Sequence, residues 1–172
     1  MKTIILGPQP PEITAFLARR RALDQDRSDE VWEGDYHVVP APHAWHAYID
    51  NTLAVLLDPP ARVAGLVGMG EFNVGESDDF RVPDLGFVRG VPNQVFVPTA
   101  AIVVEILSPG DETWEKFDFY AGRNVEEICV VDPAAKEIRW FVLTDDAYRE
   151  TGASPLLGVT AVGLARQIDW PH

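Results

Sequence analysis

Cysteine is almost absent from this chain of 172 residues. The single cysteine, Cys129, excludes an intrachain disulfide. It lies in the apolar run Ile128-Cys129-Val130-Val131, so we expect its thiol to be buried in the core. A lone buried thiol is typical of a cytoplasmic protein, and we expect that location.

Long hydrophobic runs are also missing. Ile4-Ile5-Leu6 is followed at once by Gly7-Pro8, which is too short for the apolar part of a signal peptide or for a membrane span. We therefore expect a soluble protein without a membrane partner. The chain has no repeat of fixed period, and its 14 prolines and 13 glycines are scattered along it. Its length and its 47% apolar composition predict one globular domain over 1–172.

Basic residues are scarce. Lysine and arginine number 14 against 27 aspartates and glutamates, which gives a formal net charge of -13. Bulk charge of this sign repels phosphate backbones at long range, so we expect only weak nonspecific affinity for nucleic acid. A nucleic-acid role then requires a local basic or metal-charged site. A serine nucleophile elbow, a phosphate-binding glycine loop and a zinc signature are all missing from the sequence as well.

Hydrophobic periodicity predicts an α/β fold. We expect a short amphipathic helix over 12–23 with a basic end, and a strand pair or bent strand over 30–39. A second helix is expected over 43–57, closed by Asp58-Pro59-Pro60. The remaining expected elements are strands at 63–74, 80–88, 101–107, 126–131 and 137–143, and a helix over 111–122 with Asp111 as N-cap.

The order of these elements predicts the topology. A strand at 101–107, a helix at 111–122 and a strand at 126–131 form a crossover unit, so the two strands should be parallel and adjacent or nearly so. The whole pattern is helix, three strands, helix, strand, with additional elements at both ends.

One charge interrupts the most apolar segment. In residues 101–107 the odd- and even-numbered positions are both apolar, which is typical of a central strand covered on both faces. Glu105 is the exception in this segment. A carboxylate buried there costs several kcal/mol unless it is paired or bound to a metal. An internal arginine is the alternative partner.

A second acid is expected beside Glu105. The preceding strand carries Asp84, with Gly86 leaving room next to it, although Asp84 in a Pro-Asp pair can also simply end a strand. Two neighbouring carboxylates raise each other's pKa and cannot compensate each other, whereas a shared cation can. Oxygen ligands without a histidine or cysteine cluster favour Mg²⁺ or Mn²⁺.

Lys116 is one of only three lysines. We expect Trp114, Phe117 and Ala121 to form the apolar face of its helix, with Lys116 at the border beside Tyr120. Its ammonium would then reach inward, where a point charge can orient a water or stabilise charge that develops on a phosphate. A solvated surface lysine is the alternative interpretation.

A series of segments resembles the Uma2 family of endonucleases, which belongs to the PD-(D/E)XK nuclease superfamily. The segments are Glu30-Val31-Trp32-Glu33-Gly34-Asp35, Pro42-His43-Ala44-Trp45-His46, Pro83-Asp84-Leu85-Gly86-Phe87-Val88, Val103-Val104-Glu105-Ile106-Leu107-Ser108-Pro109, Lys116, Tyr120-Ala121-Gly122 and Val130-Val131-Asp132-Pro133. The resemblance implies a restriction-endonuclease-like core over about 30–148, a mixed sheet flanked by helices, preceded by a helical extension at 1–28.

The resemblance also implies roles. Asp84 and Glu105 match the metal-binding carboxylates. The superfamily usually places its lysine two residues after the acid, where this chain has Leu107, so Lys116 on the following helix is the implied match. Two further residues, Glu30 and His46, are implied as the upstream acid and the helix histidine.

Both of these last assignments leave alternatives. Glu33 is chemically as good an acid as Glu30. His46 shares a helical stripe with Ile49, Leu53 and Leu57, which fits a hydrogen-bonded core histidine equally well.

These residues predict metal-assisted hydrolysis of a DNA phosphodiester, with Mg²⁺ or Mn²⁺ as cofactor and DNA as partner. The alternatives are a nuclease-fold binding or assembly protein with little or no turnover, and a small-molecule hydrolase that uses the same acids. We also expect a homodimer, for which Trp140-Phe141-Val142 and Pro155-Leu156-Leu157 offer an apolar surface, although core packing explains them too.

Overall fold

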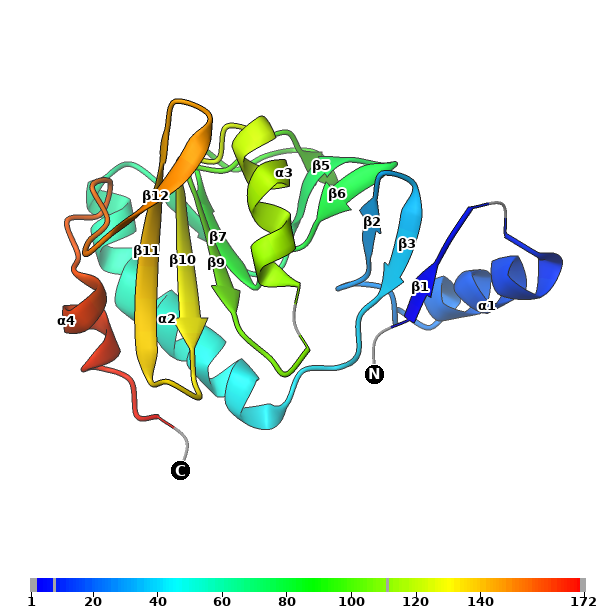
Figure 1. Ribbon diagram of the computed structural model, residues 1–172, viewed down its shortest axis with the longest axis horizontal. Coiled ribbons are helices and arrows are strands. Elements are labelled where there is room, and N and C mark those ends of the chain that lie inside the picture. The colour runs from blue at the N-terminus through cyan, green and yellow to red at the C-terminus, as the bar shows by residue number, and fades with distance from the viewer. Residues whose placement is uncertain (1–2, 8, 111, 171–172) are drawn as a thin grey trace.

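The computed structural model describes residues 3–7, 9–110 and 112–170 (Figure 1). These residues form two six-stranded sheets, and the chain passes from one sheet to the other several times. The expected mixed α/β architecture is confirmed. No helix in the described ranges combines the length and the apolar character that crossing a membrane requires. Asp111, the expected N-cap, lies outside the described residues.

The first sheet has the strand order β1-β3-β2-β6-β5-β8. Its strands are β1 (Thr3–Ile5), β2 (Glu30–Trp32), β3 (Asp35–Val38), β5 (Asn73–Glu76), β6 (Asp79–Arg81) and β8 (Phe96–Val97). Strands β2 and β3 form a hairpin, which confirms the strand pair expected over 30–39. Its turn uses Glu33 and Gly34 with φ of 50° and 92°, the left-handed conformation that a tight hairpin turn requires.

The second sheet has the order β12-β11-β10-β9-β7-β4. Its strands are β4 (Val67–Met69), β7 (Leu85–Val88), β9 (Ile102–Ile106), β10 (Glu127–Asp132), β11 (Glu137–Thr144) and β12 (Ala147–Thr151). Strands β9 and β10 are parallel neighbours, as the crossover unit predicts, and the other pairs are antiparallel. Every residue of β9 is buried, which confirms the central strand.

Helices cover both faces of this second sheet. They are α2 (Ala44–Val63), the 3-10 turn η1 (Thr113–Lys116), α3 (Phe117–Gly122) and α4 (Ala161–Ala165), whereas α1 (Pro11–Ala22) lies beside β1 at the far end of the molecule (Figure 1). The elements of the second sheet and its helices follow in the expected order of helix, three strands, helix and strand, namely α2, β4, β7, β9, α3 and β10. Strands β5, β6 and β8 of the first sheet are inserted between them and were not expected as separate strands.

The core has one layer on each face of β9. Ile102, Val104 and Ile106 pack with α2, α4 and Cys129 on one side. Val103 points to the other side, where it packs with Tyr120 of α3. The predicted burial of the Cys129 thiol is confirmed.

Several expected boundaries are wrong. Pro59 and Pro60 do not close the second helix, because α2 continues to Val63. The φ of proline fits a helix, and the hydrogen bonds lost to Pro59 and Pro60 fall in the last two turns, where Val55 is exposed to solvent. The segment 80–88 is also two strands in different sheets, β6 and β7, separated at Val82-Pro83-Asp84 because proline cannot donate to a strand ladder.

Other expectations fail for packing reasons. The segment 63–74 is likewise divided, between β4 and β5 of different sheets. The first helix exists as α1 and has three arginines in its last turn, as expected, but it buries no residue, so the expected amphipathic character is wrong. Gly86 leaves room for the ring of Phe72, whose Cε1 would lie 2.6 Å from an added Cβ, and not for the acid.

Core packing, the alternative that the sequence also allowed, takes up most of the apolar surface expected for a homodimer, whereas Pro155 is exposed and Val142 and Leu156 are partly buried. Trp140, Phe141 and Leu157 are buried within this chain's own core. They are therefore unable to cover a second copy.

Candidate active site

All five residues singled out from the sequence line a single cavity of about 390 Å³. They are Glu30, His46, Asp84, Glu105 and Lys116. They come from β2, the first turns of α2, the segment before β7, β9 and η1, so the cavity lies where the two sheets meet.

The two acids come from adjoining strands. Asp84 directly precedes β7, whose Leu85 pairs with Val104 of β9, so Asp84 lies beside Glu105 in the register. The Oδ2 atom of Asp84 accepts a hydrogen bond of 2.7 Å from the Ile106 backbone N–H. This bond fixes the Asp84 carboxylate at the end of β9.

Glu105 has a cationic partner, but that partner is a lysine. Lys116 Nζ lies 3.2 and 3.1 Å from its two carboxylate oxygens, and the Tyr120 hydroxyl donates a 2.6 Å hydrogen bond to Oε1. Pairing with an internal arginine, the alternative, is therefore wrong. Burial raises the pKa of Glu105, Lys116 opposes this, and the charges on Asp84 and Glu30 add to the rise.

Lys116 is a buried cation that bridges the two sheets. Its Nζ lies 2.9 Å from Glu30 Oε1 as well as against Glu105, and the side chain is 10% exposed. Burial alone would lower the pKa of Lys116, but the charges of Glu105 and Glu30 outweigh burial and raise it. Lys116 therefore stays protonated, and the solvated-lysine alternative is wrong.

The 3-10 turn η1 explains which side chains of the segment 113–122 are buried. With about three residues per turn, Thr113 and Lys116 stack on the inner side, and Tyr120 follows one α-turn later. Trp114, expected on the apolar face, is 44% exposed. The prediction that Trp114 lies on the buried face of a continuous helix was therefore wrong, although Lys116 does reach inward as expected.

Glu30 and Glu33 occupy different environments. Glu30 is buried, its Oε1 accepts from the Val82 N–H at 2.8 Å, and its Oε2 accepts from the Trp32 indole N–H at 2.7 Å. Glu33 lies in the exposed β2–β3 turn and does not line the cavity. Of the two acids, only Glu30 belongs to the site geometrically.

His46 contacts one of the acids. Its Nε2 lies 3.4 Å from Asp84 Oδ1, and the ring is largely buried on α2. Burial lowers the pKa of His46, but the hydrogen bond and charge of Asp84, the charge of Asp50 and the Ile106 carbonyl raise it overall. His46 thus both packs in the core and faces the site.

Three further residues bear on the site and were not proposed as site residues: Tyr120 donates a hydrogen bond to Glu105, the charge of Asp50 acts on His46, and Glu71 lines the cavity. Tyr120 lies four residues after Lys116 and Asp50 four after His46, and the i, i+4 spacing on a helix places each pair on one face. That spacing was a usable signal. Glu71 lines the cavity and accepts from the Ser28 hydroxyl at 2.8 Å, but no motif marks it in the sequence.

The donor set of the cavity fits a hard divalent cation. Carboxylates exceed cations among the lining residues, which include Glu30, Glu71, Asp84, Glu105, Glu112 and a single lysine. In the described part of the chain, no cluster of three or more histidine, cysteine or acidic side chains has the geometry of a metal site. The pair Asp84 and Glu105 is nevertheless enough for Mg²⁺, which keeps several waters and takes one or two carboxylates.

Comparison with known proteins places this chain in a family. The family model of Uma2, described as "Putative restriction endonuclease", matches residues 15–167. The chain belongs to the Uma2 family. A search of curated proteins found no match.

The Uma2 protein also resembles a solved structure. A crystal structure titled as a putative nuclease belonging to DUF820 from Anabaena variabilis ATCC 29413 aligns with a TM-score of 0.67 and 14% sequence identity. The alignment covers 81% of this chain and 90% of that one. At this identity the likeness establishes the fold alone. The family match extends beyond the 30–148 region expected from sequence and confirms the resemblance to Uma2.

Proposed function

We propose that this Uma2 protein is a divalent-metal-dependent endonuclease that hydrolyses phosphodiester bonds of DNA. One observation carries the proposal: two carboxylates from adjoining strands, Asp84 and Glu105, line one cavity with the buried, protonated Lys116. Membership in a family of nucleases supports the same conclusion. The donor chemistry favours Mg²⁺ or Mn²⁺ over zinc.

Asp84 and Glu105 would hold the metal. A bound divalent cation supplies Lewis acidity, which lowers the pKa of a coordinated water and polarises a phosphate oxygen. Asp84 is held ready by the Ile106 N–H and by His46, whose imidazole lies against its Oδ1. His46 is therefore proposed to position this carboxylate.

Lys116 is proposed to stabilise the negative charge that develops on the phosphate. Its raised pKa keeps it protonated, so it acts as a fixed cation and not as a base. Glu30 anchors Lys116 through the 2.9 Å contact and is itself fixed by the Val82 N–H. Glu30 is thus the residue that holds the cation beside Glu105.

The proposal is tested by metal binding and by cleavage together. Titration calorimetry with Mn²⁺ should detect binding to the wild type at millimolar concentration and a loss of that heat in Asp84→Ala and Glu105→Gln. The same variants should abolish Mn²⁺-dependent nicking of plasmid DNA, whereas Asp146→Ala, an exposed acid outside the cavity, should nick as the wild type does. Absence of Mn²⁺ binding, or nicking by both site variants at the wild-type rate, would refute it.

The alternative of a nuclease-fold binding protein corresponds to one outcome of this test, namely Mn²⁺ binding without cleavage. A cytoplasmic location remains part of the proposal and rests on the single buried thiol of Cys129.

We also propose a homodimer, on a different surface from the buried one. On α1 the side chains of Glu12, Phe16 and Arg19 follow each other at helical spacing and are exposed. Phe16 is 46% exposed, and neither Glu12 nor Arg19 has an ion-pair partner within the described residues. Antiparallel packing of two copies of α1 would cover Phe16 and set the acid of each copy against the arginine of the other.

A further inference from the structure

The candidate active site continues into two further hollows. Ser108 and Pro109 line both the active-site cavity and a second hollow of about 600 Å³, which Trp45 also lines. Lys136 lines both that second hollow and a third of about 480 Å³, which ends at Arg166 and Trp170. Neighbouring hollows share lining residues, so the three adjoin one another, and we refer to them together as the groove.

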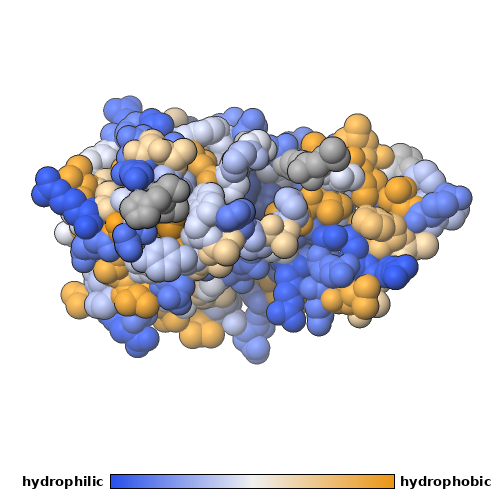
Figure 2. Space-filling view, turned by 90° about the horizontal axis from the view of Figure 1, so that it is seen from below, coloured by the Kyte–Doolittle hydropathy of each residue, from blue (hydrophilic) through white to orange (hydrophobic). Residues whose placement is uncertain are grey.

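The groove lies at one end of the molecule. The start of α2, the β10–β11 turn and the segment after α4 meet there, at the bottom of Figure 1. Figure 2 looks onto this end and shows polar and apolar side chains interleaved, without one continuous apolar patch. A surface of this kind suits a ligand that is itself part polar and part apolar.

Two unpaired cations mark the far part of the groove. In the described part of the chain, most lysine and arginine side chains form an ion pair, as Arg20, Arg89 and Arg139 do. The cationic side chains without a carboxylate within 4.0 Å among the described residues are Arg19, Lys136, Arg149 and Arg166. Two of them, Lys136 and Arg166, line the same hollow. The third hollow is also lined by Glu137 and the second by Asp132, so Lys136 and Arg166 give the third hollow two cations against one acid, which favours an anion there in a chain of net charge -13.

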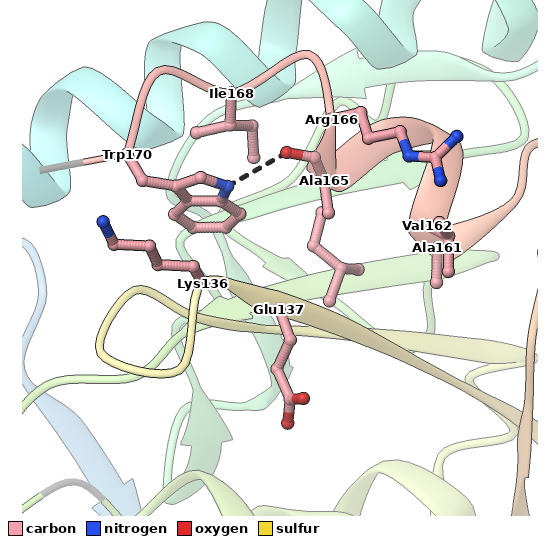
Figure 3. Close-up of a pocket in the computed structure, with 9 residues that line it drawn as sticks. Lys136, Glu137, Ala161, Val162, Ala165, Arg166, Ile168 and Trp170 are labelled. Atoms are coloured by element: carbon pink, nitrogen blue, oxygen red, sulfur yellow. Dashed lines mark hydrogen bonds between the residues drawn. The ribbon is translucent and has the colours of Figure 1, made fainter.

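Aromatic rings alternate with these cations. Trp45 lies beside the active-site histidine, with ring centroids of Trp45 and His46 6.2 Å apart. Trp170 is fixed by a 3.0 Å hydrogen bond from its indole N–H to the Ala165 carbonyl. Figure 3 shows the Lys136 side chain running alongside the Trp170 ring. Along the groove, the order is therefore aromatic, cation, aromatic and cation.

We propose that this groove binds a single-stranded segment of the nucleic acid whose phosphodiester enters the active-site cavity. The proposal rests on the proposed function. Single-stranded nucleic acid is recognised by aromatic faces on which its bases stack and by cations that contact its phosphates. Bases in a duplex are already stacked on each other and cannot use Trp45 and Trp170 in this way. Two cations are also far fewer than the several phosphate contacts on which duplex binding depends.

Binding is tested without cleavage. Fluorescence anisotropy of a labelled oligothymidylate of about 12 nucleotides, in EDTA, measures the affinity of the full chain. Lys136→Glu and Arg166→Glu should each raise the Kd at least about threefold and make it less salt-dependent. Arg149→Glu is the matched control, because it reverses an exposed, unpaired cation outside the groove, and it should leave the Kd unchanged.

The stacking contribution is tested separately. Trp170→Ala should raise the Kd at least about fivefold, and Trp170→Phe, which keeps an aromatic face, should recover most of the affinity. If Arg149→Glu raises the Kd as much as Lys136→Glu and Arg166→Glu do, net charge and not the groove determines the affinity, and the proposed binding in the groove is wrong. Tighter binding of a duplex of equal length would overturn the single-strand assignment.

The two proposals fail in different ways. A wild type that nicks DNA but does not bind the oligothymidylate would refute the groove and leave the proposed nuclease intact. A wild type that binds it through Lys136 and Arg166 but never cleaves would support the groove and refute the nuclease.

Discussion

Among single residues, Asp50 carries the clearest pH signature. It is half-buried on α2, its Oδ1 has no hydrogen-bond partner among the described residues, and burial and the charge of Asp84 raise its pKa to about 6. The unfolded value is 3.8, so the protonated form is favoured in the folded state. Its stabilising contribution is complete below pH 3.8 and is lost as the pH rises through about 6.

We therefore expect Asp50→Asn to be more stable than the wild type at pH 8 by about 1 kcal/mol, a figure reduced for its partial exposure, and similar at pH 4. Urea unfolding at both pH values measures the difference. The exposed Asp146→Asn is the control and should show no such pH dependence. An Asp50→Asn variant that gains nothing at pH 8 would contradict the expectation.

The site residues differ in how far the sequence could predict them. Glu105 was found because a charge in a strand that is apolar on both faces needs a partner, and that argument depends on the local pattern alone. Glu30 and His46 came from the family resemblance, since their packing against Val82 and Asp84 depends on long-range contacts. The inward direction of Lys116 was predicted from the sequence, but its pairing with Glu105 was not, because that pair depends on how η1 packs against β9.

Among the secondary-structure elements, β10 holds a buried carboxylate that lies outside the active-site cavity and has a structural arrangement. Glu127 is almost fully buried and accepts from the Trp140 indole, the Ser154 hydroxyl and the Leu156 N–H. These bonds join β10 to β11 and to the segment that leads to α4.

We expect Glu127→Ala to lower the free energy of unfolding by about 3 kcal/mol, because it leaves three donors without their charged acceptor. The exposed Glu137→Ala on β11 should change it by less than about 0.5 kcal/mol. Urea denaturation compares the two variants. Equal effects would show that the Glu127 bonds contribute nothing specific.

Element types were easier to predict than their ends. The crossover of β9 and β10 follows from short apolar strands on either side of a helix, and both strands lie within one residue of their expected ends. The segments 63–74 and 80–88 looked like single strands because local pattern does not reveal a change of sheet. Short strands such as β8, with two residues, carry too little pattern to be detected.

For the whole molecule, the proposed dimer allows a charge-exchange test. Arg19→Glu should dissociate the dimer, because it places an acid against Glu12 of the second copy, whereas the double variant Glu12→Arg with Arg19→Glu should restore it. Sedimentation equilibrium measures the mass of each. Arg149→Glu is the control of equal charge change and should sediment as the wild type does. A monomeric wild type, or a double variant that stays monomeric, would contradict the arrangement.

The segment Val82-Pro83-Asp84 has one more consequence. It is the direct covalent passage from β6 of one sheet to β7 of the other, while Glu30 and Glu105 stand on opposite sides of the boundary and share one ammonium group. The two contacts of Lys116 in the cavity thus connect the two sheets. A ligand in the cavity therefore touches residues of both sheets at once, so binding it and joining the two sheets depend on the same few atoms.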